Sequence, residues 1–193
     1  MDLTQGTFEE KNNRAKKMML WFGIISLVMS FAGWTSAFVV SSSRPDWLKD
    51  FVLPNAFIIS TFVIFLSSIT FMLAKKALKA NHRKVVALWL IATLILGLVF
   101  IYNQFLGFQQ IIDLGYNFTG PTSNVTMSYI YLIAVVHILH VVVGLICLLV
   151  VIYNHFKQKY GPSKMLGFEL AATFWHFIDI LWVYLFLFLY FVG

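Results

Sequence analysis

The sequence predicts an all-α fold, a polytopic membrane bundle of five transmembrane helices. Of its 193 residues, 60% are hydrophobic and 11% are charged, whereas about a quarter of the residues in a soluble domain are charged. Five apolar runs each reach the roughly 20 residues that a helix needs to cross a hydrocarbon core ~30 Å thick. These runs are continuous rather than alternating, which excludes a transmembrane barrel. The predicted spans are residues 18–40, 53–74, 85–107, 127–153 and 171–192.

The first span follows a polar segment at residues 1–17. The arrangement does not fit a cleaved signal peptide, because the apolar run is too long and lacks a small-residue cleavage site. We therefore expect a polar N-terminal head at 1–17, followed by a five-helix transmembrane domain at 18–193.

The second and third spans contain polar side chains, but none near mid-depth is titratable. The second span carries Asn55 and the pair Ser67-Ser68. The third carries four residues of interest: Thr93, Gly97, Asn103 and Gln104.

The distribution of Lys and Arg predicts the orientation. Four precede the first span, five separate the second span from the third, and three separate the fourth from the fifth. Only two lie between the first and second spans. Because loops rich in Lys and Arg stay in the cytoplasm, we expect a cytoplasmic N-terminus. The net charge of +6 reflects this asymmetry, so no nucleic-acid partner is predicted.

The basic loops can also hold the headgroups of anionic phospholipids, at about 1 kcal/mol per side chain near the surface. The candidates for such contacts are Arg83, Lys84 and Lys157. A purely topogenic role is the favoured interpretation of these charges.

The fourth and fifth spans contain the titratable side chains: His137, His140, Glu169, His176 and Asp179. An ionisable group inside a span costs several kcal/mol and therefore indicates a functional or paired group. Because the two helices run in opposite directions, His140 and Asp179 should lie at similar depths. We expect Asp179 and His176 to hold the fifth helix against the fourth through a histidine. Glu169 should lie at the cytoplasmic end, within reach of water.

This cluster has three interpretations. The favoured one is a structural cluster that locks two helices together, and the second is a chain of proton-exchange sites. Haem ligation is the third, but it needs one histidine on each of two facing helices, whereas His137 and His140 share one helix. No metal site and no catalytic residue are predicted, and Cys147 is expected to be inert.

Three motifs point to a known family. The fifth span contains Gly167-Phe168-Glu169, then Trp175-His176-Phe177-Ile178-Asp179, Trp182 and Tyr190. The fourth contains His137, His140, Val141 and Gly144, and the third contains Thr93, Gly97, Phe100 and Gln104. From about residue 18 to its end, the chain resembles subunit III of the haem–copper oxidases (cytochrome c oxidase subunit 3), in its five-helix bacterial form.

The sequence departs from this family at two positions. Many members carry a buried Glu where this sequence has Leu27, and a second Glu where it has Gly107. A role of the first carboxylate in proton or oxygen handling therefore cannot be transferred to this chain.

The resemblance implies a subunit without redox centres in the inner (plasma) membrane of a bacterium. In the family, haem and copper lie in subunit I, which is the main contact of subunit III beside other oxidase subunits. Subunit III binds phospholipid and sustains proton uptake while the enzyme reduces dioxygen to water and pumps protons. Cytochrome c is the expected electron donor. The alternatives are a quinol oxidase subunit and a stand-alone proton-conducting or redox membrane protein, and a larger respiratory supercomplex remains open.

Overall fold

The computed structural model describes residues 6–48, 53–118, 120, 123–161 and 164–192. Five long helices account for most of them, which confirms the predicted fold class. They are α1 (Phe8–Ser41), α2 (Asn55–Lys79), α3 (Arg83–Asp113), α4 (Val125–Phe156) and α5 (Leu166–Val192).

Most of the helices extend beyond the predicted apolar spans. α1 begins at Phe8, so most of the polar segment before residue 18 is helical. Its first turn is closed by a capping box, in which the Thr7 hydroxyl accepts from the Glu10 amide and the Glu10 carboxylate accepts from the Thr7 amide. With 34 residues, α1 is about 51 Å long at ~1.5 Å per residue. Its polar first turns therefore project beyond the hydrocarbon core.

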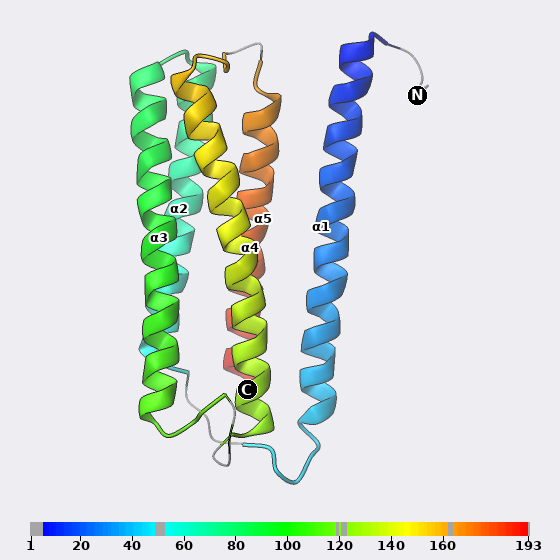
Figure 1. The fold of residues 1–193 in the computed structure, drawn as a ribbon, viewed down its shortest axis with the longest axis vertical. Coiled ribbons are helices and arrows are strands. Elements are labelled where there is room, and N and C mark those ends of the chain that lie inside the picture. The colour runs from blue at the N-terminus through cyan, green and yellow to red at the C-terminus, as the bar shows by residue number, and fades with distance from the viewer. Residues whose placement is uncertain (1–5, 49–52, 119, 121–122, 162–163, 193) are drawn as a thin grey trace.

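Helices α2 to α5 form a closed ring, in which α2 contacts α3, α3 contacts α4, α4 contacts α5, and α5 contacts α2. In the described part of the chain, α1 contacts α4 and α5 but neither α2 nor α3. Figure 1 shows α1 beside the other four helices rather than among them. The molecule is thus a four-helix bundle with one helix packed against its side.

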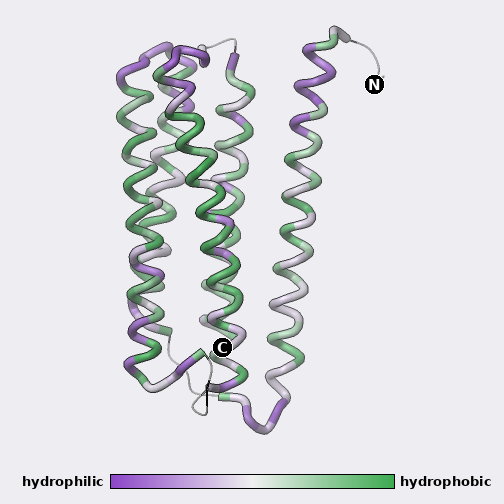
Figure 2. The backbone as a smooth tube through the Cα atoms, in the orientation of Figure 1, coloured by the Kyte–Doolittle hydropathy of each residue, from purple (hydrophilic) through white to green (hydrophobic). Residues whose placement is uncertain are grey.

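The helices meet through large apolar side chains and also expose apolar side chains outward. Phe31 and Phe38 of α1 are buried, with relative exposures of 1% and 0%. The outward faces carry residues such as Phe62, Leu98 and Leu139, and the middle of every helix is mainly hydrophobic in Figure 2. A helix that is apolar on all sides suits a lipid environment.

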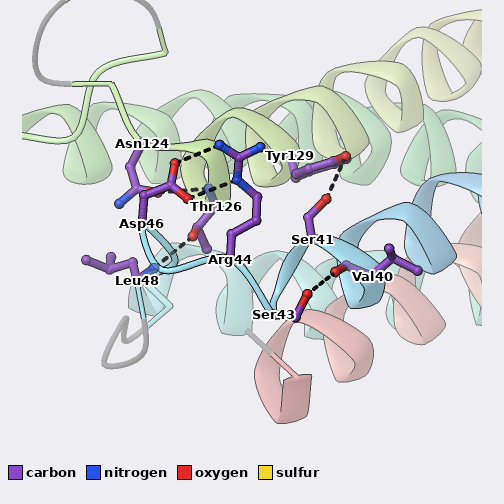
Figure 3. Close-up of polar contacts among 9 residues, drawn as sticks. All are labelled: Val40, Ser41, Ser43, Arg44, Asp46, Leu48, Asn124, Thr126 and Tyr129. Atoms are coloured by element: carbon purple, nitrogen blue, oxygen red, sulfur yellow. Dashed lines mark hydrogen bonds and ion pairs between the residues drawn. The ribbon is translucent and has the colours of Figure 1, made fainter.

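The loop after α1 is tied to the start of α4 (Figure 3). The Ser41 hydroxyl donates to the Tyr129 hydroxyl at 3.0 Å, and the Leu48 amide donates to Thr126 Oγ1 at 3.0 Å. The same loop contains an exposed ion pair, in which the Arg44 guanidinium lowers the pKa of the Asp46 carboxyl. These contacts order the end of the bundle that holds the C-terminus.

The polar segments alternate between the two ends of the bundle. The N-terminal turns of α1, the α2–α3 turn and the α4–α5 loop share one end, which we call the basic end, and the C-terminus lies at the other (Figure 1). This alternation is the one expected for five successive spans. The cytoplasmic location of the basic end stays a prediction.

Candidate functional site

The inner face of α5 carries three large or polar residues in succession, Trp175, Asp179 and Trp182. Their spacings of four and three residues place them on one side of a helix. All three are buried, with relative exposures of 2%, 4% and 1%. This face of α5 points into the ring and forms the centre of the candidate site.

Trp175 contacts the other three helices of the ring. Its indole Nε1 donates to Ser67 Oγ of α2 at 3.1 Å. A Cβ added to Gly97 of α3 would lie 2.9 Å from the Trp175 ring, and one added to Gly144 of α4 would lie 3.2 Å from it. The ring therefore fits where α3 and α4 both lack a side chain.

Trp182 forms a second layer of the same kind. Its indole Nε1 donates to Thr61 Oγ1 of α2 at 3.1 Å. The ring centroid lies 5.3 Å from that of Phe100 of α3 and 5.0 Å from the imidazole of His137 of α4. Two tryptophan layers thus join all four helices at two depths.

Hydroxyl groups of α2 also form hydrogen bonds with side chains of α3. Gln104 Nε2 donates to Ser60 Oγ at 2.8 Å, and the hydroxyls of Thr70 and Thr93 are hydrogen-bonded at 2.8 Å. A polar group in hydrocarbon has no water to bind, so a partner on the adjacent helix satisfies it. The small polar residues of α2 therefore provide hydrogen-bond partners for both of its neighbours.

The histidines do not pair with Asp179 as we expected. His137 Nε2 donates to the backbone carbonyl of Ile178 at 3.2 Å, and His140 Nδ1 donates to the carbonyl of Val136 in its own helix at 2.7 Å. His137, rather than His140, thus reaches α5 at the depth of Asp179.

His176 joins α5 to α2 instead of α4. Its Nδ1 lies 2.6 Å from the Ser68 hydroxyl, with which it is hydrogen-bonded. We expected His176 to help hold α5 against α4, but its hydrogen-bond partner Ser68 lies on α2.

Asp179 lies between the two tryptophan layers. Neither oxygen of its carboxyl group meets hydrogen-bond geometry with any residue in the described ranges, although Ser68 is close enough to interact with it. An unpaired buried carboxyl is costly in free energy. Hydrogen bonds and ion pairs among the described residues therefore do not explain the presence of Asp179.

Glu169 lies at the basic end, one-third exposed, as the sequence led us to expect. Its carboxylate is 3.5 Å from Lys17 Nζ of α1 and 3.6 Å from Lys75 Nζ of α2. Glu169 thus links three helices at the membrane surface. The predicted headgroup contacts, Arg83, Lys84 and Lys157, are exposed near the same end.

The buried polar side chains connect helices. Within the described residues, no group of three or more His, Cys, Asp or Glu side chains is arranged to hold a metal ion. The fold and these contacts define a small integral membrane protein in which most of the buried polar side chains described above contact neighbouring helices.

Comparison with known proteins identifies the family. The family model described as "Cytochrome c oxidase subunit III" matches residues 3–193. The chain is 33% identical over 141 residues to cytochrome bo(3) ubiquinol oxidase subunit 3 of Buchnera aphidicola, covering 72% of this chain and 70% of that protein. It is 28% identical over 192 residues to cytochrome c oxidase subunit 3 of Alkalihalophilus pseudofirmus, covering 98% and 91%. It is also 28% identical over 204 residues to cytochrome c oxidase subunit 3 of Loxodonta africana, covering 98% and 76%.

The chain therefore belongs to the cytochrome c oxidase subunit III family, whose members are subunits of haem–copper oxidases. It is a multi-pass protein of the inner membrane. The family-motif positions of the sequence all lie in the helix contacts described above; they are Thr93, Gly97, Gln104, Gly144, Trp175 and Trp182.

Proposed function

We propose that this chain is the non-redox subunit III of an oxidase that reduces dioxygen to water and pumps protons. It packs beside subunit I, which holds the haem and copper, and it sustains proton uptake and the stability of the complex. One observation supports the proposal most directly. The family-motif residues Trp175 and Trp182 fill the interior of the ring and join its helices. Such residues make the subunit a rigid lateral support.

Phospholipid is part of the same proposal. Two apolar grooves border α1: one of about 410 Å³, whose lining includes Leu20 and Phe174, and one of about 370 Å³, whose lining includes Phe31 and Ile180. Their apolar walls suit acyl chains. Arg83, Lys84 and Lys157 supply exposed basic side chains at the basic end for headgroups.

Cytochrome c is the proposed electron donor of the enzyme. In support, the two relatives that align with 98% of the chain are both named cytochrome c oxidase subunit 3. Ubiquinol is the second candidate, because the relative with 33% identity is named a ubiquinol oxidase subunit. Oxygen consumption by the purified complex with reduced cytochrome c, compared with ubiquinol, distinguishes the two donors.

Affinity purification tests the central proposal. The tagged chain, extracted from its native membrane in mild detergent, should co-purify with a larger subunit that contains haem and copper. An intact oxidase that lacks this chain, together with recovery of the chain alone, would contradict the proposal.

A further inference from the structure

A second kind of groove, of about 440 Å³, lies between α2 and α5 near the basic end. We call it the lysine groove. Its lining includes Met72, Lys75, Lys76 and Lys79 of α2 and Thr173 and His176 of α5. Unlike the grooves beside α1, it combines several cations with hydrogen-bonding groups and an apolar wall.

The two helices present these residues at helical spacing. Met72, Lys75, Lys76 and Lys79 fall at i, i+3, i+4 and i+7, so they share one face of α2. Thr173 and His176 are three residues apart on α5 and share one face in the same way. The lysines therefore gather along one wall, and the hydroxyl and imidazole stand on the other.

The groove changes in polarity with depth. α2 runs toward the basic end, so Lys79 lies nearest the membrane surface and Met72 lies about 10 Å deeper, at ~1.5 Å per residue. His176 is fixed at the deeper part, because its Nδ1 is hydrogen-bonded to Ser68 at 2.6 Å. A molecule that fits this groove has an anionic end at the surface and an apolar part toward the core.

The charges favour an anion. Three lysines line the groove, and no acidic side chain is among its lining residues. The nearest carboxylate, that of Glu169, lies 3.6 Å from Lys75 and also 3.5 Å from Lys17, so two cations already neutralise it. Lys76 and Lys79 are exposed and keep their charge available for a ligand.

We propose that the lysine groove binds the headgroup of an anionic phospholipid, with its phosphate beside Lys76 and Lys79. The lipid acyl chains then run along the apolar surfaces of α2 and α5. Arg83 and Lys84 are not among the lining residues of this groove, and the site does not depend on which oxidase the chain serves. It places a specific lipid against His176, the residue that joins α5 to α2.

Native mass spectrometry of the purified full-length chain tests the proposal, with phosphatidylglycerol and phosphatidylcholine as separate probes. The wild-type chain should retain phosphatidylglycerol in preference to phosphatidylcholine. The double variant Lys76→Gln/Lys79→Gln should retain it about thirtyfold less, because each lysine near an anionic headgroup contributes about 1 kcal/mol. Added inorganic phosphate should not displace the lipid, since the site also holds its apolar part.

The matched control is Lys11→Gln/Lys16→Gln, which removes the same charge from exposed positions of α1 at the basic end and should leave retention unchanged. Thermal unfolding of both variants checks that each is folded. Equal loss of lipid in the two variants would overturn the proposal, because it would mean diffuse attraction to the charge of the basic end. Unchanged retention in Lys76→Gln/Lys79→Gln, or equal retention of the two lipids by the wild-type chain, would overturn it as well.

Discussion

At the scale of single residues, the packing of Trp175 explains why two glycines face it. The indole ring occupies the space that side chains at Gly97 and Gly144 would fill. A large ring between small residues allows α3, α4 and α5 to approach closely, as small residues do at helix contacts in membranes. Gly97 and Gly144 lie within regular helices, so neither is needed for an unusual backbone conformation. Their role is to leave space for the Trp175 ring, because glycine has no Cβ.

We predict that Gly97→Ala destabilises the protein. The added Cβ would lie 2.8 Å from Leu145 Cδ2 and 2.9 Å from the Trp175 ring. Overpacking of this kind costs about 1–3 kcal/mol, which exceeds the ~0.5–1 kcal/mol that alanine gains over glycine in a helix. The melting temperature in detergent should therefore fall.

Gly33→Ala is the control for this prediction. Gly33 lies in α1, and nothing is within 4 Å of a Cβ placed there. The melting temperature of the Gly33→Ala variant should stay unchanged or rise. An equal effect of the two substitutions would show that the contact with Trp175 is not the cause.

A second prediction separates the roles of His176 and Asp179. His176→Leu removes the hydrogen bond that joins α5 to the half-buried Ser68 hydroxyl of α2, and such a bond contributes about 0.5–1.5 kcal/mol. Asp179→Leu breaks no hydrogen bond to a described residue. His176→Leu should therefore weaken retention of the subunit in the oxidase more than Asp179→Leu does. Subunit content after purification is the measurement.

Asp179→Asn tests the proton-exchange interpretation. The amide keeps the shape of the side chain but cannot carry an exchangeable proton between sites. For a packing role, retention and initial oxygen consumption should both stay near the wild-type values. Loss of initial oxygen consumption at full retention would instead assign Asp179 to proton transfer.

At the scale of helices, the sequence predicted which segments form helices but not which helices pair through polar groups. Apolar runs determine the spans locally, so all five were predictable. The partner of His176 was harder to predict, because Ser68 is a common residue in helices and carries no charge to mark it. The Ser67-Ser68 pair was visible, and the buried Trp175 indole needs an acceptor. This requirement indicates Ser67, the acceptor of the Trp175 indole, but it does not indicate Ser68.

Helix α1 depends on few contacts, which leads to a third prediction. It packs against α4 and α5 through buried residues such as Phe31, whose ring centroid lies 5.7 Å from that of His140. Its ion pair between Lys17 and Glu169 is partly exposed and contributes little. Phe31→Ala, a change that costs about 3–5 kcal/mol in a core, should raise hydrogen exchange in α1 while α2 to α5 stay protected.

The control for α1 is Phe22→Ala. Phe22 is 66% exposed on the same helix, so its loss should leave exchange unchanged. Faster exchange throughout α2 to α5 in Phe31→Ala would show that α1 is an integral part of the bundle rather than an attached helix.

At the scale of the whole molecule, the charge asymmetry and the fold agree. The segments that contain most of the basic residues meet at one end of the bundle, which is hydrophilic in Figure 2. The ion pairs of Glu169 with Lys17 and Lys75 join three helices near this end. Twelve of the fourteen Lys and Arg residues belong to these segments. Because loops rich in Lys and Arg usually stay in the cytoplasm, we predict that this end is cytoplasmic.

The fourth prediction is that Lys79→Cys, in a Cys147→Ala background, reacts with a membrane-impermeant thiol reagent in inverted vesicles but not in intact cells. Lys79 is exposed at the end of α2, at the basic end. Arg44→Cys, in the loop at the opposite end, should react in intact cells and so controls for access of the reagent. Labelling of the cysteine at position 79 in intact cells, with none at position 44, would contradict the predicted orientation and indicate the opposite one. The lysine groove would then face the anionic lipids of the outer rather than the cytoplasmic leaflet.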